Sequence, residues 1–205
     1  TPASPGIYTF VFKAADKTGT FDQDTIHFNV IQNSPPVAVN PPATVDTVIC
    51  AGGQVCRQFS ATDVDGNGSV WAKLSGTGTV SPTGLWCFTA NVTGNYCVTA
   101  TVSDLCGTKD TVSMCYNLSI NTPPVAINPP ASVDTFICAP AQICRQFSAT
   151  DANGGGLVWA IVSGSGTISP AGLWCFNVNT TGNFCVSAAV TDPCGAKDTV
   201  TMCYN

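Results

Sequence analysis

The residues best suited to chemistry in this 205-residue chain are twelve cysteines, arranged in two sets of six. Each member of the first set recurs 88 positions later: Cys50, Cys56, Cys87, Cys97, Cys106 and Cys115 are followed by Cys138, Cys144, Cys175, Cys185, Cys194 and Cys203. Zinc sites need more closely paired ligands, whereas the closest cysteines here read C-x5-C and His27 is the one histidine. We therefore expect all twelve cysteines to form disulfides, which persist in oxidising, extracytoplasmic compartments.

A second group of candidate ligands lies in the loop DVDGNG, where Asp63, Asp65 and Asn67 match the opening of a calcium-binding loop. The pattern is incomplete, because Leu74 stands where a bidentate Glu is required, and the second copy of the loop reads DANGGG at 151–156. The sequence favours the alternative, an ordinary Asp/Asn/Gly turn between strands. Calcium at this loop is thus the one cofactor to consider, and we expect no other.

Four asparagines lie in sequons that accept N-linked sugar: Asn67, Asn91, Asn117 and Asn179. Asn91 and Asn179 are equivalent positions in the two copies, in the turn before the GNYC or GNFC strand, which makes them the better surface acceptors. Chance occurrence of the tripeptide in a Thr-rich sequence is the alternative.

Catalytic chemistry has little support. His27 lies outside both complete copies, which excludes a His-based triad in either of them. Asp104 and Asp110 flank a turn, and capping of that turn explains them better than acid and base roles. Four tryptophans at matching positions are expected in the core, with sugar stacking as the alternative: Trp71, Trp86, Trp159 and Trp174. We expect a protein that is not an enzyme.

The amino-acid composition limits the kinds of partner that the chain can bind. Charged residues make up 9% of the chain and the net charge is −5, so no basic patch is available for nucleic acid. No apolar run reaches membrane-spanning length, so we expect no direct membrane insertion by this segment. An uncharged surface of this kind suits a protein that is glycosylated or packed against copies of itself.

The cysteines are carried by a structural unit that repeats every 88 residues along the chain. Residues 33–117 and 121–205 agree at about 60 of 85 positions, which identifies an array of one repeated unit. We predict repeats at 33–120 and 121–205, joined by the stiff segments NSPPVAVNPP and NTPPVAINPP. Residues 1–32 match the closing third of a repeat, so they are expected to be the C-terminal strands of an incomplete one and to pair with something outside this chain.

Within a repeat, short alternating runs separated by Gly, Pro and Asn turns predict an all-β sandwich of about seven strands. In YCVTATVS the even-numbered residues Tyr96 and Val98 fall on the inner face, while Cys97 and Thr99 fall on the outer face. The cysteines are therefore expected on the outside of the sheet, unlike the buried inter-sheet disulfide of antibody domains.

The stretches FSATDVDGNG, GTVSPTGLWCF and GNYCVTATVSDLCGTKDTV resemble the tandem immunoglobulin-like or cadherin-like repeats of bacterial extracellular surface proteins. This resemblance covers essentially the whole chain. It implies tandem Greek-key β-sandwiches that serve as spacers, adhesin segments or filament subunits. The cysteine density, which predicts disulfide-rich sandwiches here, departs from the usual pattern of that family.

Immunoglobulin-like strand order would place Cys97 beside Cys115 and Cys56 beside Cys87, and would leave Cys50 and Cys106 at opposite ends of one sandwich. Cys50 could then reach Cys194 of the next repeat as an interdomain clasp. The alternative is sequential pairing of Cys50 with Cys56, Cys87 with Cys97 and Cys106 with Cys115.

Taken together, these features predict a structural repeat protein that forms a fibre, filament or cell-surface stalk in the extracellular space. The alternative is an adhesin or carbohydrate-binding spacer of a larger secreted protein. The expected partners are copies of the chain or adjacent repeats, with glycans as a further candidate.

Overall fold

The computed structural model describes residues 4–66 and 68–205, and its regular structure within them consists of β-strands. Contacts between residues divide the chain into two compact units. The first unit comprises the residues up to Val45, Gln54–Ala90 and Asn95–Asn117. The second comprises Asp46–Gly53, Asn91–Gly94 and Leu118–Asn205.

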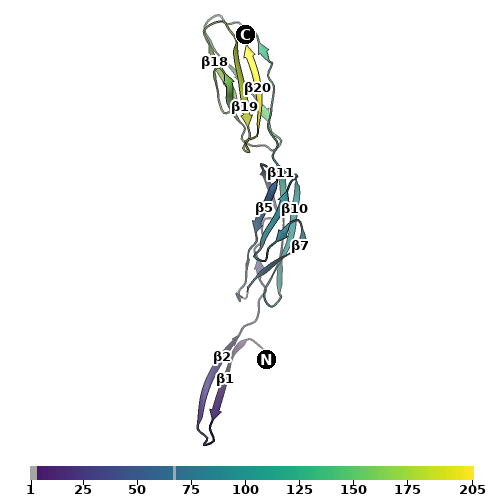
Figure 1. Ribbon diagram of the computed structural model, residues 1–205, viewed down its shortest axis with the longest axis vertical. Helices are drawn as coiled ribbons and strands as arrows, with labels where there is room; N and C mark the ends of the chain where they lie inside the picture. The colour runs from purple at the N-terminus through teal and green to yellow at the C-terminus, as the bar shows by residue number, and fades with distance from the viewer. Residues whose placement is uncertain (1–3, 67) are drawn as a thin grey trace. The chain divides into compact units, whose positions relative to one another are not determined.

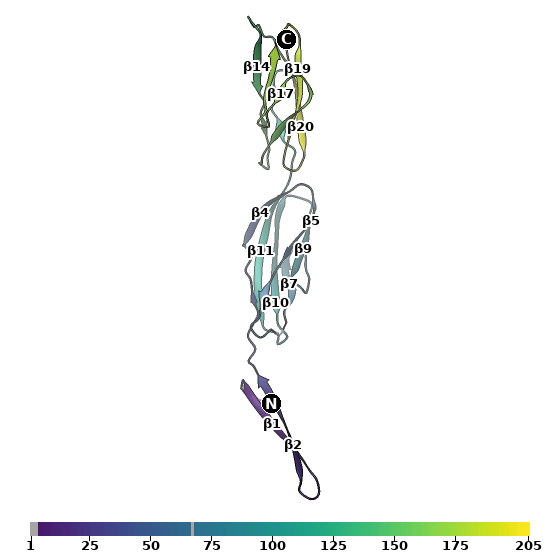
Figure 2. The ribbon, with the colours of Figure 1, turned by 90° about the vertical axis from the view of Figure 1, so that its left-hand side faces the viewer.

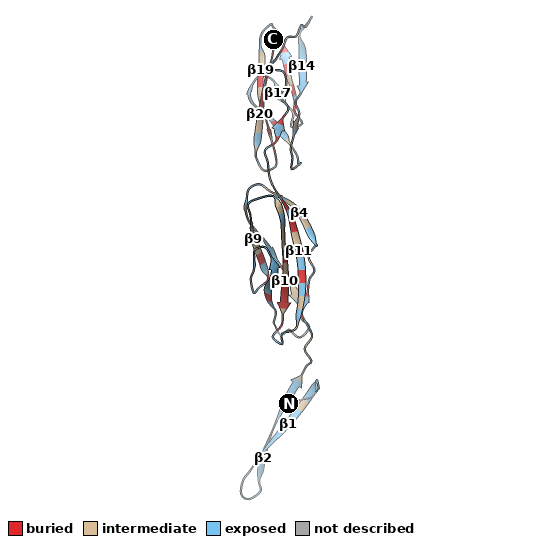
Figure 3. Ribbon diagram, turned by 90° about the vertical axis from the view of Figure 1, so that its right-hand side faces the viewer, coloured by how far each residue is buried: buried red, intermediate tan, exposed pale blue. Residues whose placement is uncertain are grey.

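The chain begins with an antiparallel hairpin of β1 (Gly6–Ala15) and β2 (Phe21–Val30), drawn in purple in Figure 1. Its turn is closed by Asp16, which accepts hydrogen bonds from the backbone N–H of Thr18 at 2.8 Å and of Thr20 at 3.0 Å. Figure 3 colours nearly all of the hairpin as exposed. Phe10, Phe12 and Phe28 are among its exposed residues. The residues equivalent to these three in the next repeat, Val98, Ala100 and Tyr116, are buried.

The first repeat forms two main sheets. In the described residues the larger sheet has the order β4-β11-β10-β7 and the smaller has the order β5-β9-β8, with β3 and β6 paired separately. The strands are β3 (Val37–Ala38), β4 (Thr44–Ile49), β5 (Gly53–Gln58), β6 (Ala61–Thr62), β7 (Val70–Gly76), β8 (Thr79–Val80), β9 (Leu85–Ala90), β10 (Gly94–Ser103) and β11 (Lys109–Ile120). Figure 2 shows β4 running beside β11.

The second repeat has the same arrangement, with the sheets β13-β20-β19-β16, β14-β18-β17 and β12-β15 in the described residues. Its strands are β12 (Val125–Ala126), β13 (Ser132–Val133), β14 (Ala141–Gln146), β15 (Ala149–Thr150), β16 (Val158–Gly164), β17 (Thr167–Ile168), β18 (Leu173–Val178), β19 (Phe184–Thr191) and β20 (Lys197–Tyr204). The all-β sandwich predicted from the alternating pattern is confirmed by these sheets.

Side chains alternate between the two faces of each strand, and the inward-facing ones form the core. In the second repeat the inward residues of β16, β18, β19 and β20 make one buried cluster: Trp159, Trp174, Phe176, Val186, Ala188, Val190, Val200, Met202 and Tyr204. The Trp174 indole N–H donates to the carbonyl of Ser165 at 2.8 Å, which satisfies its polar atom inside the core. The tryptophans are therefore core residues, and Trp71, Trp86 and Trp159 are buried as well.

One glycine position in each repeat is fixed by a close approach of two strands. Gly76 has a φ of 96°, and a Cβ atom there would lie 2.2 Å from the carbonyl oxygen of Cys97. Gly164, its equivalent, has a φ of 107° and the same 2.2 Å clash with the carbonyl oxygen of Cys185. Only glycine combines this backbone conformation with the space available.

Candidate functional site: the cysteine pairs and the linker contacts

Two disulfides lie on the outside of each sandwich. Cys97 of β10 bonds Cys115 of β11, and Cys56 of β5 bonds Cys87 of β9. The second repeat repeats both bonds, Cys185–Cys203 and Cys144–Cys175, between residues that are direct partners in the strand register. Because side chains alternate along a strand, these sulfurs lie on the face opposite the core.

A fifth disulfide joins the two repeats. Cys50, in the loop between β4 and β5, bonds Cys194, in the turn between β19 and β20, with the two Cα atoms 5.2 Å apart. The two residues are 144 positions apart in sequence, and both belong to the second compact unit. We call this bond the clasp.

A buried carboxylate holds the turn that carries Cys194. Asp192 is 5% exposed, and one of its oxygens accepts the backbone N–H of Ala196 at 2.8 Å. Its other oxygen accepts the side-chain amide of Asn121 at 2.7 Å, while the backbone N–H of Asn121 donates to the carbonyl of Ile49 at 2.9 Å. Asn121 therefore ties the turn before Cys194 to the strand end before Cys50.

These hydrogen bonds stabilise the charged form of Asp192. The amide of Asn121 is the largest cause that lowers the pKa of the Asp192 carboxyl below its ordinary value, with backbone N–H groups of the turn adding to it. The equivalent Asp104 also has a lowered pKa, caused first by the hydroxyl of Thr108 and also by the amide of Asn33, which lies 2.8 Å away. The linker asparagine and the turn aspartate thus form one recurring pair.

In each repeat a second aspartate binds the linker a few residues after the asparagine. Asp110 accepts the backbone N–H of Ala38 at 2.9 Å, and Asp198 accepts that of Ala126 at the same distance. These bonds are the first cause of the lowered pKa of both carboxyls. Asp104 and Asp110 therefore act as anchors for the linker and its turn, as the capping interpretation of these two residues predicted in part.

Two cysteines differ from the expectation that all twelve are bonded. Among the described residues, Cys106 and Cys138 carry free, exposed thiols. They are 88-residue equivalents of the two clasp partners, Cys106 of Cys194 and Cys138 of Cys50.

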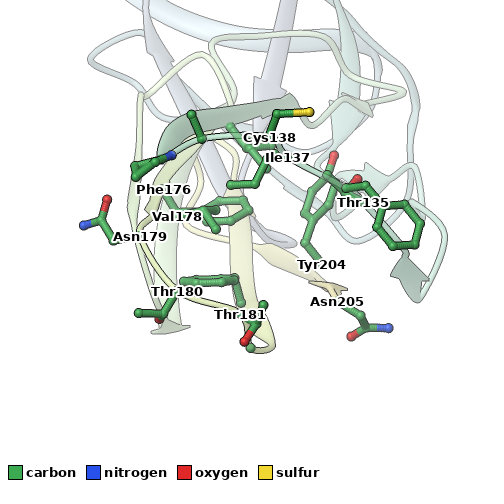
Figure 4. Close-up of a pocket in the computed structure, with 16 residues that line it drawn as sticks. Thr135, Ile137, Cys138, Phe176, Val178, Asn179, Thr180, Thr181, Tyr204 and Asn205 are labelled. Carbon is green, nitrogen blue, oxygen red and sulfur yellow. The ribbon is translucent and has the colours of Figure 1, made fainter.

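A groove adjoins one of the free thiols. It has a volume of about 340 Å³ and is lined by the segment 135–140, the strand end at Phe176 and Val178, the turn 179–182 and the strand residues Phe184 and Tyr204. Figure 4 shows Cys138 next to Ile137 among the residues that line the groove. The groove lies entirely within the second repeat and is mostly apolar.

The calcium candidates make contacts of another kind. Asp65 accepts the backbone N–H of linker residue Ser34, and Asp63 accepts the backbone N–H of Asp65 at 2.9 Å. In the second repeat Asn153 accepts the N–H of Thr122 in the same way, at 2.7 Å. Asn67 lies outside the described residues, and in the described part of the chain no three acidic, His or Cys side chains gather as metal ligands.

The sequon residues Asn91, Asn117 and Asn179 are exposed, and Asn179 lies at the groove beside Cys138. The fourth sequon, at Asn67, is outside the described residues. His27 pairs with Thr9 across the hairpin, with 3.0 Å between Thr9 Oγ1 and His27 Nδ1. Within residues 4–66 and 68–205 we find no apolar helix with the length needed to cross a bilayer.

Sequence reasoning missed the linker hydrogen bonds. Asn33 and Asp104 are 71 positions apart, and neither residue type is unusual where it stands. The available signal was the recurrence of both residues at the same separation in the second repeat, as Asn121 and Asp192.

Comparisons with known proteins show the fold. No family model and no curated protein matches the chain. Among solved structures, extracellular cadherin domains 3–6 of protocadherin gamma B2 match with a TM-score of 0.52 and 16% identity, covering 97% of this chain and 58% of that one. A protocadherin gammaB7 EC3-6 cis-dimer structure matches with a TM-score of 0.50 and 15% identity, covering 98% and 60%.

Immunoglobulin domains 1–5 of Sidekick-1 also match, at 15% identity and a TM-score of 0.48 over 100% of this chain and 47% of that one. The chain thus spans about three fifths of the length of the two protocadherin structures. At these identities the likeness concerns the backbone arrangement. The fold is an all-β arrangement of tandem sandwiches like those of the protocadherin extracellular cadherin domains.

Proposed function

We propose that this chain is a load-bearing segment of an extracellular fibre or cell-surface stalk, built from disulfide-braced sandwiches. The observation that carries the proposal is the clasp, because a covalent bond between Cys50 and Cys194 links one repeat directly to the next. The four outer-face disulfides support the same role, since each closes part of its sandwich against extension. Disulfides of this number also favour an oxidising, extracellular location.

The surface supports the proposal as well. The chain carries few charges, 9% of its residues, which limits electrostatic repulsion between neighbouring copies. The buried tryptophans remove the stacking platform on which a carbohydrate-binding role would depend. A structural role with copies of the chain or adjacent repeats as partners therefore fits the described residues better than sugar binding.

The mechanical consequence of the clasp follows from the path of the force. When the two chain ends are pulled, the load passes from Cys50 to Cys194 through one S–S bond, and the residues between them are bypassed. Without the clasp the load runs through the intervening chain, shortened by the loops that the other four disulfides close: Cys56–Cys87, Cys97–Cys115, Cys144–Cys175 and Cys185–Cys203. The difference is about 45 residues, or on the order of 150 Å of extended chain.

Single-molecule force spectroscopy tests the proposal. The reference protein is the double variant Cys106→Ser, Cys138→Ser, which keeps the clasp and removes both free thiols. The test protein adds Cys50→Ser and Cys194→Ser to that background. We expect the final extended length of the test protein to exceed that of the reference by on the order of 150 Å. Equal lengths under non-reducing conditions would show that the clasp carries no load.

A further inference from the structure

One asparagine triplet recurs in both complete repeats while its neighbours change. Residues 89–94 read TANVTG, and their equivalents 177–182 read NVNTTG. Three of the six residues differ, yet the asparagine and the threonine two positions after it are kept, as Asn91 and Thr93 in the first repeat and as Asn179 and Thr181 in the second. The pattern Asn-x-Thr is an acceptor for N-linked sugar. We call residues 91–93 the acceptor triplet.

The other two sequons do not recur in this way. The equivalent of Asn67 is Gly155, which has no side-chain amide. The equivalent of Asn117 in the first hairpin is Asn29, which is followed by Val-Ile and so lacks a hydroxyl two positions later. Comparison of the repeats therefore singles out the position of Asn91.

Asn91 is exposed, in the turn between β9 and β10. The linker that follows the repeat contacts the same turn, because the backbone N–H of Ile120 donates to the Thr93 hydroxyl at 3.0 Å. Asn91 is therefore exposed with this linker packed against its turn. The middle residue of the acceptor triplet, Val92, is 67% exposed. A group attached to Asn91 can extend directly into solvent.

The side-chain amide of Asn91 is not used by the fold. Within residues 4–66 and 68–205 it takes part in no hydrogen bond. The linker asparagines differ, because the amide of Asn33 donates to Asp104 and that of Asn121 donates to Asp192. A sugar on either of those amides would compete with the contact to a turn carboxylate. A sugar on Nδ2 of Asn91 displaces no contact of this kind.

We propose that Asn91 is a modification site that carries an N-linked oligosaccharide. The proposal goes beyond the structural role proposed above and does not depend on the clasp. A hydroxyl-rich glycan suits this surface, since charged residues make up only 9% of the chain. Glycans are bulky and strongly hydrated, so a glycan at this turn supplies hydration that charged side chains provide on other surfaces.

The attachment is a group transfer that needs an activated donor, an oligosaccharide linked through its anomeric carbon to a polyprenyl diphosphate. Nδ2 of Asn91 forms a bond to the anomeric carbon while the bond from that carbon to the diphosphate oxygen breaks. The polyprenyl diphosphate leaves with the electron pair of the broken bond, and one amide proton passes to a base of the transferase. The transferase recognises the Thr93 hydroxyl together with the asparagine.

Mass spectrometry of the protein isolated from its source tests the site. Trypsin cuts after Lys73 and Lys109, so after reduction and alkylation the acceptor triplet lies in the peptide 74–109. We expect this peptide to carry an oligosaccharide. Electron-transfer fragmentation, which leaves the sugar on its residue, should place it on Asn91. A peptide without sugar, or with sugar at Asn95 or at a hydroxyl side chain in place of Asn91, would overturn the proposal.

Dependence on the acceptor triplet is tested with variants of the full chain, secreted by a host that performs N-linked glycosylation. Asn91→Gln removes the acceptor amide, and Thr93→Val keeps that amide but removes the hydroxyl. Both variants should lose the sugar at position 91, whereas Thr93→Ser, which keeps a hydroxyl, should retain it. Sugar that stays on Asn91 in Thr93→Val would contradict recognition through the triplet.

The matched control is Asn40→Gln, at an exposed asparagine that is followed by proline and belongs to no sequon. This variant should keep the sugar at Asn91, and its loss there would contradict the assignment. Asn91→Gln should still yield the Cys50–Cys194 peptide under non-reducing conditions, because the amide contributes no contact to the clasp. The force experiment measures the clasp and the mass spectra measure Asn91, so either proposal can fail without the other.

Discussion

Thr9 and His27 face each other across the first hairpin at the positions that Cys97 and Cys115 occupy in the first complete repeat. Thr9 Oγ1 lies 3.0 Å from His27 Nδ1, and the two residues are direct partners in the register of β1 and β2. In the repeat, the equivalent residues form a disulfide with their Cα atoms 4.0 Å apart. The hairpin therefore has a hydrogen bond at the position where the first complete repeat has a disulfide.

This relationship predicts that the double variant Thr9→Cys, His27→Cys forms a new disulfide, because the hairpin keeps the strand register of β10 and β11. Peptide mapping under non-reducing conditions should recover the 9–27 pair. The matched control is Thr9→Cys, Thr25→Cys, whose residues are not direct partners, since Thr25 pairs with Val11. If the control bonded as readily as the test pair, the register of the hairpin would not be the one described.

The same comparison shows how far sequence alone reaches. Alternation along YCVTATVS is enough to separate Val98 and Ala100, which are buried, from Cys97 on the outer face. The 88-residue period is enough to predict two like sandwiches, and the all-β fold is confirmed. These features depend on periodic patterns of residue type, which can be found directly in the sequence.

Other features could not be obtained in this way. Cys106 and Cys138 have the same local sequence context as their bonded equivalents, Cys194 and Cys50, so no local pattern separates the free thiols from the bonded ones. The hydrogen bond between Asn121 and Asp192 joins residues 71 positions apart, and no local pattern marks either partner.

Asn121→Ala should loosen the turn that carries Cys194. The variant removes the largest cause of the lowered Asp192 pKa, so this pKa should rise toward its ordinary value. NMR titration of the Asp192 carboxyl measures that change, and amide exchange at Ala196 should become faster. Asn33→Ala is the matched control, because it acts on Asp104 in the other repeat. An unchanged Asp192 titration in Asn121→Ala would contradict the contact.

Acid should destabilise both repeats through their linker anchors. The pKa values of Asp104, Asp110, Asp192 and Asp198 are lowered from an ordinary value of 3.8 by the hydrogen bonds that they accept. A lowered folded-state pKa contributes stability that is present above the unfolded value and is lost as the pH falls through the folded value. Unfolding midpoints should therefore be flat from neutral pH to about pH 5 and should drop below about pH 4.

Denaturant unfolding at a series of pH values measures this effect. Asp198→Asn, which cannot ionise, should be less stable at neutral pH and should lose less stability on acidification. Asp22→Asn, in the exposed hairpin, serves as the control and should retain the full acid dependence. If Asp198→Asn and the unsubstituted protein had parallel pH profiles, the contact with Ala126 would make no contribution to the acid dependence.

Gly164→Ala should be strongly destabilising, because it combines two penalties at one position. The φ of 107° disfavours a side chain, and the added Cβ would lie 2.2 Å from the carbonyl oxygen of Cys185, where β16 approaches β19. Gly195→Ala separates the two effects, since its φ is 84° and its Cβ would meet nothing within 4 Å. We expect the free energy of unfolding to fall by about 1 kcal/mol in Gly195→Ala, from the backbone conformation alone.

In Gly164→Ala the free energy of unfolding should fall by about 3 kcal/mol or more, because the strands must separate to admit the methyl group. Urea unfolding of both variants with all disulfides intact provides the comparison, and equal losses would mean that β16 and β19 are not in close contact at Gly164.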